Sequence, residues 1–435
     1  MHPSKVQIII ISVVLFIVLL LVLVFMGILP GLRSTGEDIV SGELLIWGVD
    51  NSSVISSSLI ASYQALYPEV NISYQSFNPA NYETQLINAL AGGRGPDIFM
   101  VHSSWIPEHK DKMAFLDQTQ YPLESLRNDF PDVVAKDFYQ DGRTYALPLY
   151  IDTLTLFYNR DIFNNEGIVR APSSWEELNQ LIPRLVEKTE SGRIVRAAIA
   201  LGASRTNIPN AADILSLFML QDEVQMTSQD KREARFASGG ENSLRRYLSY
   251  ANPANANYSW NEEMRNAEDV FASEDLAILI DYASKENSLK QKNPFINLGI
   301  ASLPQYEDSQ KATNYASYWG FAVANTSPNQ SLAWGFIGNT VLNQEAMSSY
   351  SSLTNRAPAL LSLIAQLSAN PNKEFLARQI LTADSWYIIN KEFVDQSFSN
   401  MIRSVLNAQA DPRTAISKSE AEIGQLLKEN ADAQN

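Results

Sequence analysis

The chain has 435 residues, no cysteine and a formal net charge of −15. It is long enough for two hydrophobic cores, because a single core stops growing at about 250–300 residues. The absence of cysteine excludes disulfides, a thiolate nucleophile, cysteine-bound metal and a lipid-modified cysteine anchor. An acidic chain also repels nucleic acid, whose nonspecific binding depends on basic groups that neutralise phosphates. We therefore expect no DNA or RNA partner.

The N-terminal segment predicts a membrane anchor. Residues 6–29 form an apolar run that is interrupted by Gln7, Ser12 and Gly27. As a helix rising about 1.5 Å per residue, this run would be about 36 Å long, enough to cross a hydrocarbon core of about 30 Å. We predict a transmembrane anchor over residues 1–33 and a linker over residues 34–42. The protein would then sit in the cell membrane as a single-pass protein.

The orientation of this anchor follows from weak charge asymmetry. Lys5 precedes the apolar run, whereas Arg33 is soon followed by Glu37 and Asp38. This bias favours an inside N-terminus, with the bulk of the chain extracellular or periplasmic. A cleaved signal peptide is the alternative, although no small-residue cleavage site is obvious near residues 26–32.

The next segments alternate between strand and helix patterns. Strands are predicted over residues 43–48, 70–77 and 97–101. Between them, apolar residues recur at helical spacing at Ile55, Leu59, Tyr63 and Leu66, and again over residues 81–90. This alternation is typical of a doubly wound sheet, in which ligands lie outside the carboxyl ends of the strands. Residues 47–51 and 102–105 occupy two such ends.

Residues 146–178 combine a buried strand with a well-marked helix start. Residues 153–158 are rich in β-branched and aromatic side chains without polar alternation, which favours a strand buried on both faces. Ser174 is placed to cap the next helix while Glu177 reaches back to it, as in a capping box. Pro183 lies within the helical pattern and should kink or shorten that helix.

This segment resembles the passage that joins the lobes of the extracellular solute-binding proteins of ABC importers, the family that includes the maltose-binding protein. The matching residues are Pro148, Tyr158, Asn159, Arg160, Asp161, Pro172, Trp175, Glu176, Glu177 and Leu178. Residues 95–99 (Gly-Pro-Asp-Ile-Phe) and 318–323 (Tyr-Trp-Gly-Phe-Ala-Val) resemble two further passages of the family. Together with the first strand, these matches span residues 42–425.

The resemblance implies an α/β, two-lobed fold of the type II periplasmic-binding-protein kind, with a mixed sheet flanked by helices in each lobe and the predicted transmembrane helix before them. It implies a first lobe of residues 43–150 plus 300–342 and a second lobe of residues 151–299 plus 343–430. It also implies a monomer without catalytic residues or cofactor. Such a protein captures a small molecule, here expected to be a carbohydrate, and delivers it to the permease subunits of an ABC importer.

Aromatic residues at strand ends are the main functional signal. A sugar ring has an apolar face that packs on an aromatic ring, while its hydroxyls need fixed donors and acceptors. The predicted ligand contacts are Trp47, Asp50, Asn51, Ser104, Trp105, Tyr150, Asp152, Asp281, Tyr282, Tyr318, Trp319, Arg356, Trp386 and Tyr387. Any single tryptophan could instead belong to a core. Trp175 and Trp334 lie within helical patterns and are predicted to do so.

Other chemistry has less support in the sequence. His102, His109 and Glu108 could share a metal ion, but they lie in a loop-rich segment and we predict no metal site.

Asp50 and Asp152 could serve as the catalytic pair of a glycosidase, which needs two carboxylates at a set separation. An anchored carbohydrate-active enzyme therefore remains an alternative, as does a surface sensor or interaction protein with the same fold. Within the binding class, a peptide, polyamine or metal chelate is an alternative ligand.

Overall fold

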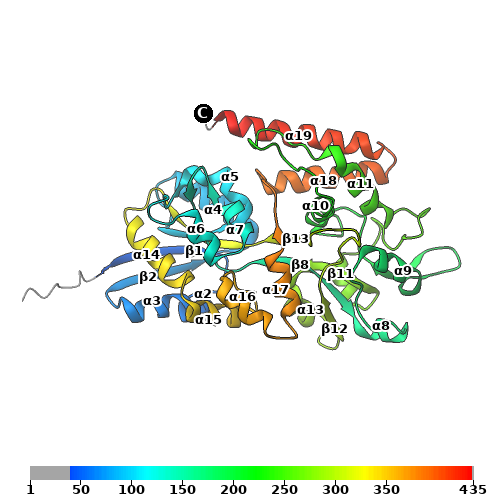
Figure 1. The fold of residues 1–435 in the computed structure, drawn as a ribbon, viewed down its shortest axis with the longest axis horizontal. Coiled ribbons are helices and arrows are strands. Elements are labelled where there is room, and N and C mark those ends of the chain that lie inside the picture. Colours follow the sequence, from blue (N-terminus) through cyan, green and yellow to red (C-terminus); the bar gives the residue numbers. More distant parts are fainter. Residues whose placement is uncertain (1–39, 434–435) are drawn as a thin grey trace, which may run out of the picture.

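The computed structural model describes residues 40–433. These residues form two lobes side by side, each built on its own sheet and its own hydrophobic core (Figure 1). Both sheets contain parallel and antiparallel neighbours. The predicted two-lobed α/β architecture with mixed sheets is confirmed.

The first sheet has the strand order β2-β1-β3-β14-β4, with β7 paired to β14. Its strands are β1 (Gly42–Gly48), β2 (Val70–Ser76), β3 (Ile98–His102), β4 (Met113–Ala114), β7 (Leu147–Pro148) and β14 (Trp319–Ala324). β1 runs parallel to both β2 and β3, whereas β14 runs antiparallel to β3. The β-α-β-α-β order predicted for residues 43–101 is confirmed, and the carboxyl ends of β1, β2 and β3 share one edge of the sheet.

Helices cover both faces of this sheet. They are α2 (Ser52–Ile55), α3 (Ala61–Leu66), α4 (Pro79–Ala91), α5 (Ile106–His109), α6 (Leu123–Asp129), α7 (Asp132–Phe138) and α14 (Gln330–Val341). A π-helical turn, Ser56–Ile60, joins α2 to α3, and a hairpin of β5 (Tyr139–Gln140) and β6 (Arg143–Thr144) follows α7. Ile55, Leu59 and Tyr63 are buried as predicted, but Leu66 is 60% exposed. The predicted apolar face therefore ends one turn early.

The second sheet has the strand order β15-β13-β8-β11-β10-β9, with β12 also paired to β8. Its strands are β8 (Asp152–Asn159), β9 (Glu187–Lys188), β10 (Ile194–Ile199), β11 (Leu276–Tyr282), β12 (Leu298–Ala301), β13 (Asn314–Ser317) and β15 (Ala383–Asp384). Every residue of β8 except Tyr158 is buried. The prediction of a strand buried on both faces is confirmed, because helices and neighbouring strands enclose it.

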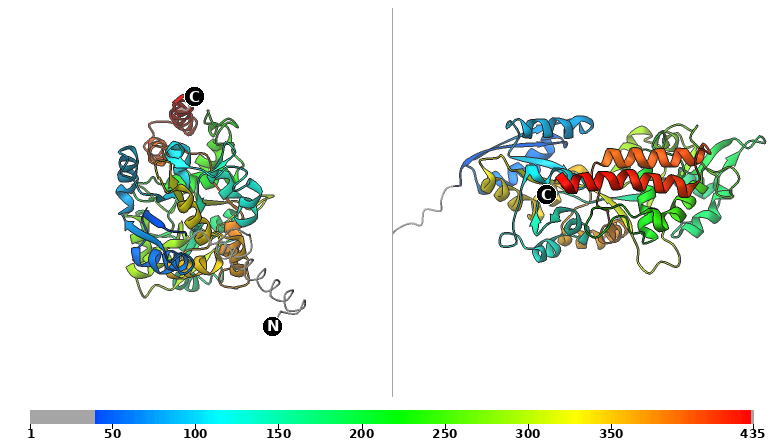
Figure 2. Two further views of the ribbon diagram at one scale, coloured as in Figure 1. Left: turned by 90° about the vertical axis from the view of Figure 1, so that its left-hand side faces the viewer. Right: turned by 90° about the horizontal axis from the view of Figure 1, so that it is seen from above.

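The helices of the second lobe surround this sheet. They are α8 (Arg160–Asn165), α9 (Trp175–Leu185), α10 (Ala211–Gln221), α11 (Ala237–Ser249), α12 (Ala267–Ala272), α13 (Glu286–Lys292), α18 (Lys391–Leu406) and α19 (Pro412–Ala433). Figure 2 shows α18 and α19, orange and red, lying side by side across this lobe.

The predicted start of α9 is confirmed in outline. The Ser174 hydroxyl accepts a hydrogen bond from the backbone N–H of Glu177 at 3.0 Å. The Glu177 carboxylate reaches back one residue further than a capping box requires, because it accepts from the N–H of Ser173 at 2.8 Å. Pro183 does not stop the helix, which continues to Leu185.

The predicted boundary near residue 343 is wrong. α15 (Gln344–Thr354), α16 (Leu361–Ser368) and α17 (Glu374–Leu381) were assigned to the second lobe, yet their apolar faces lie in the first core. Tyr350, Ile364 and Ile380 are fully or almost fully buried there. The chain enters the second lobe for the last time only after α17. An amphipathic helix shows which face is buried but not which of two cores buries it.

Three chain segments that run between the lobes form a hydrogen-bonded ribbon. β13 pairs with β8, Ala316 opposite Thr153, and with β15, Tyr315 opposite Asp384. β13 was assigned to the first lobe together with β14, but its strand pairing lies in the second sheet. Only Tyr318 separates β13 from β14, so the chain changes sheet at this residue.

A buried glutamine fastens this ribbon to the first lobe. Gln379 of α17 is 2% exposed, and its amide donates to the Thr155 hydroxyl of β8 at 2.9 Å. Its carbonyl oxygen accepts from the backbone N–H of Leu303 at 2.8 Å. The NH₂ group and the carbonyl oxygen of the Gln379 side chain therefore both have hydrogen-bond partners in segments of the second lobe.

The predicted anchor, residues 1–33, lies outside the described residues. Among residues 40–433, no helix is long and apolar enough to cross a membrane.

Gly320 in β14 offers a test of the packing where β14 meets β7. A Cβ there would lie 2.7 Å from the Phe138 ring and closer still to the Leu147 carbonyl oxygen. Gly320→Ala should lower the free energy of unfolding by about 1–3 kcal/mol, measured by urea denaturation. Gly338→Ala in α14 is the control, because a Cβ there meets nothing within 4 Å. It should be neutral or stabilising by up to about 1 kcal/mol; equal losses would contradict this packing.

Candidate ligand-binding site

Five aromatic rings gather at the carboxyl ends of the first-lobe strands. Trp47 lies 4.5 Å from Phe77 between ring centroids, and Tyr82 lies 5.7 Å from Phe77. Trp105 and Trp319 each lie 6.0 Å from Tyr82 and 5.0 Å from each other. Tyr82 is fully buried, whereas the other four rings are half-buried. We call these five residues the aromatic cluster; Tyr82 supports a partly exposed apolar surface.

His102 connects the aromatic cluster to the opposite lobe. Its Nδ1 lies 2.8 Å from the Ser104 hydroxyl, and its Nε2 lies 2.8 Å from the hydroxyl of Ser317 in the ribbon. Burial, together with the positive charge of Lys391 in the second lobe, lowers the pKa of His102 to about 4, whereas the Asp213 carboxylate opposes the shift. The imidazole is therefore neutral near pH 7 and can donate one hydrogen bond and accept another.

The second lobe contributes a set of ion-paired and hydrogen-bonded side chains near His102. The Lys391 ammonium lies 2.9 Å from one Asp213 oxygen and also pairs with Asp395. The Tyr282 hydroxyl donates to the other Asp213 oxygen at 2.8 Å. These side chains come from α10, β11 and α18, which are distant in sequence. Donors and acceptors are thus held in fixed positions on the second lobe.

A cavity lies between the lobes. It has a volume of about 460 Å³ and is lined by His102 from the first lobe and Lys391 from the second. A wider outer space of about 1200 Å³ shares Gln140, Lys231 and Tyr387 with it, so the two form one groove. The inner volume alone is within the range of about 300–1000 Å³ that small-molecule sites occupy.

Tyr387 lies at the junction of these two spaces, as expected of a ligand contact. The Lys231 ammonium lies 4.7 Å from the centroid of the Tyr387 ring. Ser104, another predicted contact, also lines the inner cavity. Both residues therefore line the space between the lobes, and their contact with a ligand stays a prediction.

Three predicted contacts form a separate buried cluster instead. Arg356 lies 2.6 Å from an Asp50 oxygen, and the Tyr350 hydroxyl donates to the same carboxylate. The Arg356 guanidinium also lies 4.3 Å from the centroid of the Tyr150 ring. Asp50 and Tyr150 are both 5% exposed. The Asp50 carboxylate is therefore already held by protein partners, and the prediction that it is free to bind a ligand is corrected. Tyr150 and Arg356 lie with it, and Arg356 lines a cavity other than the inner one.

Three other predicted contacts do not line the inner cavity. Tyr318 is fully buried, and its hydroxyl donates to Asp137 at 2.8 Å. Asn51 is exposed and caps α2. Asp152 lines a different cavity, of about 930 Å³, which shares no lining residue with the inner one. Because Asp50 is held by Arg356, the suggested pair of Asp50 and Asp152 does not face one space as a glycosidase pair would.

Two predicted residues of the second lobe are largely buried. Trp386 forms a wall of the inner cavity but stacks on Phe398 at 6.2 Å, and its Nε1 donates to the Ser216 hydroxyl. Asp281 is 4% exposed and accepts from the N–H of Tyr282 at 2.7 Å. Burial raises the pKa of Asp281 to about 7.

Sequence reasoning missed several residues that the fold adds to this place. Phe77 follows β2, so the rule that identified Trp47 would also have found it; His102 was placed at a strand end but was not predicted as a ligand contact. Tyr82 lies on the buried face of α4 and shows no polar signal of its own. Asp213 lies in the first turn of α10, where an acidic residue is ordinary, and Lys391 is the first residue of α18. Neither residue's sequence neighbours indicate that the two side chains pair.

Comparison with known protein families identifies the family of this chain. The model of the family described as "Bacterial extracellular solute-binding protein" matches residues 52–347, which is more than half of the chain. The chain belongs to this family. The resemblance seen in the sequence is confirmed.

The curated relatives of this solute-binding protein are distant. The maltotriose-binding protein of Pyrococcus abyssi is 22% identical over 312 residues, covering 71% of this chain and 64% of that protein. A putative binding protein of Brucella abortus is 20% identical over 301 residues, covering 63% of this chain and 69% of that protein. The diacetylchitobiose-binding protein DasA of Streptomyces coelicolor is 24% identical over 163 residues, covering 37% and 38% of the two chains. The match thus spans less than two thirds of the first relative.

Solved structures share the fold of this solute-binding protein. The cyclic α-maltosyl-1,6-maltose binding protein of Arthrobacter globiformis aligns with a TM-score of 0.75 at 16% identity, covering 90% of this chain and 100% of that one. A cyclo/maltodextrin-binding protein complexed with maltotetraose aligns with a TM-score of 0.73 at 16% identity, covering 91% and 99%. At such low identity these likenesses establish the two-lobed architecture alone.

The Asp50–Arg356 pair predicts a large cost for removing one partner. Arg356→Met leaves a buried carboxylate without its cation and should lower the free energy of unfolding by about 3–5 kcal/mol. Arg205→Met is the control, because its partner Glu392 has a side chain that is 73% exposed, and it should cost less than about 1 kcal/mol. Adding Asp50→Asn to Arg356→Met should recover most of the loss. Urea denaturation measures all four proteins, and similar costs for the two arginines would contradict a structural role.

Proposed function

We propose that this protein captures a sugar or oligosaccharide between its two lobes and delivers it to the permease subunits of an ABC importer. The observation that carries the proposal is a cavity between the lobes that is lined by His102 and Lys391, with two half-buried tryptophan rings, Trp105 and Trp319, packed beside His102. An apolar sugar face can pack on the rings while hydroxyls meet His102, Ser104, Tyr282 and Lys391.

The ribbon supports a hinge for this capture. The aromatic cluster lies on one side of it and the Asp213 group on the other, so bending at the ribbon changes the width of the groove. Closure would be favoured when a ligand makes more contacts in the closed state than in the open one. The importer would then recognise the loaded, closed form.

The names of relatives favour a carbohydrate over other ligands. Besides maltotriose-binding and diacetylchitobiose-binding proteins, the relatives include an arabinooligosaccharide-binding protein of Halalkalibacterium halodurans and the maltodextrin-binding protein MdxE of Bacillus subtilis. These ligands differ in sugar and linkage, so they support the class of ligand but not one member of it.

We further infer that residues 6–29 anchor the protein in the membrane, with the two lobes outside it. Their apolar length matches a bilayer, and importer delivery requires a position at the membrane. After cell fractionation, the protein should stay with membranes through alkaline carbonate washing and should retain its original N-terminus on sequencing. Release by the wash, or a new N-terminus after residue 26, would contradict anchoring without affecting ligand capture.

Ligand capture can be tested by thermal unfolding. The full chain is melted against mono- and oligosaccharides, polyamines and peptides, because a ligand that binds only the folded state raises the melting temperature by mass action, worth about 2.7 kcal/mol at 100 times Kd. We expect a rise with one family of sugars, recovered unaltered by chromatography. A chemically altered sugar would indicate an enzyme, and no rise with any sugar would contradict the proposal.

The aromatic cluster predicts which substitutions weaken binding. Trp105→Ala and Trp319→Ala should each weaken binding of the identified sugar by about 1–3 kcal/mol, because each removes a stacking surface. Trp334→Ala in α14 is the matched control, since Trp334 packs against the first core but has no described ring contact with the aromatic cluster. Isothermal titration calorimetry measures the three affinities. Unchanged affinity in both cluster variants would contradict the stacking model.

A further inference from the structure

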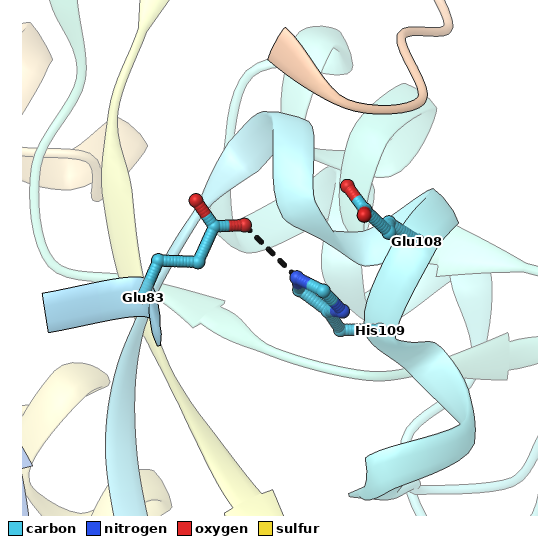
Figure 3. Close-up of side chains that lie close together, drawn as sticks. All are labelled: Glu83, Glu108 and His109. Atoms are coloured by element: carbon cyan, nitrogen blue, oxygen red, sulfur yellow. Dashed lines mark hydrogen bonds and ion pairs between the residues drawn. The ribbon is translucent and has the colours of Figure 1, made fainter. Parts of the chain in front are cut away.

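Two carboxylates and a histidine converge beside the aromatic cluster. Glu83 comes from α4, whereas Glu108 and His109 come from α5, and Figure 3 shows the three side chains directed toward one another. The nearest ligand atoms of the three residues all lie within 4.8 Å of one another. We infer that Glu83, Glu108 and His109 form a binding site for a divalent transition-metal cation such as Zn²⁺.

The separations suit a metal after a small adjustment. His109 Nε2 lies 2.9 Å from Glu83 Oε1. Ligand atoms bound at about 2.0–2.2 Å around one Zn²⁺ are about 3.3 Å apart in a tetrahedral site. The closest pair must therefore separate by a few tenths of an ångström, while Glu108 must move inward by no more than about 1.5 Å. Glu108 is half-buried at the edge of the outer groove, so its side chain has room for this movement.

The charges around the site favour a cation. Within residues 40–433, neither Glu83 nor Glu108 has a lysine or arginine partner. The nearby lysines pair elsewhere, Lys110 with Asp141 at 2.7 Å and Lys112 with Asp111 at 2.9 Å. No described lysine or arginine therefore neutralises the two glutamates, so both carboxylates, together with the imidazole, are available to a bound cation. The side chain of His109 is only 10% exposed, so its orientation toward Glu83 is fixed by packing.

The donor types select the class of metal. Imidazole nitrogen with carboxylate oxygens is the ligand set of Zn²⁺, Co²⁺ and Mn²⁺ sites, whereas Ca²⁺ and Mg²⁺ prefer oxygen alone. Three protein ligands leave at least one coordination position for water. The cation would connect α4 to α5, because its ligands come from both helices.

The site is linked to the proposed sugar surface through one ring contact. His109 packs edge to face with Trp105, 6.4 Å between ring centroids. A cation held by His109 would restrict this imidazole and thereby the Trp105 ring on its other side. The metal would act as a structural clamp behind the aromatic cluster. Its binding does not depend on the identity of the sugar or on whether a sugar binds.

Cobalt provides the direct test, because Co²⁺ takes Zn²⁺ sites and gives visible absorption bands that report its ligands. The untagged full chain is titrated with Co²⁺ and then with Zn²⁺. We expect one Co²⁺ per chain with visible bands, and loss of the bands as Zn²⁺ displaces it. Glu83→Gln and Glu108→Gln should each weaken Co²⁺ binding by about tenfold or more, because each removes a ligand.

Two controls keep the result interpretable. Glu124→Gln removes an exposed carboxylate in α6 and should leave Co²⁺ binding unchanged. Glu108→Gln removes no described ion pair, so it should fold normally even if the buried His109→Asn variant does not. Absence of visible bands at millimolar Co²⁺ would overturn the inference. So would bands of undiminished affinity in both Glu83→Gln and Glu108→Gln.

Discussion

The hydrogen-bonded ribbon of β8, β13 and β15 constrains the rest of the molecule. Each strand belongs to the second sheet but continues into the first lobe, so three chain crossings are held in fixed register. Gln379 of α17 in the first lobe fastens β8 and the backbone at Leu303. Sliding of one lobe past the other would break paired backbone groups that are shielded from water, so the ribbon restricts how the lobes can move. The ribbon therefore determines where the groove lies between the two lobes.

Burial at the lobe boundary controls the charge of groups that would meet a ligand. Burial holds the pKa of His102 down to about 4, and raises that of Asp281 to about 7 and that of Asp137 to about 6. Lys391 remains charged but is paired with Asp213. The neutral imidazole of His102 and the paired ammonium of Lys391 can therefore hydrogen-bond to a hydroxyl without leaving a charge desolvated.

Sequence patterns predicted local structure well and long-range packing poorly. The alternating elements of the first lobe and the cap at Ser174 depend on neighbouring residues, and both are confirmed. The strand-end rule found Trp47, Trp105 and Trp319, which the fold brings together. It could not reveal that Asp50 pairs with an arginine 306 positions away. Nor could it decide which core receives α15 to α17, because either lobe offers an apolar surface.

The short distance between the ribbon and the aromatic cluster has a consequence for how specificity can evolve. Ser317 belongs to the ribbon and Trp319 to the cluster, with only the buried Tyr318 between them. A substitution that tilts the Trp319 ring toward a new ligand must also disturb the pivot about which the lobes turn. Under the proposed function, ligand choice and ligand release would therefore be coupled, because one short segment serves both.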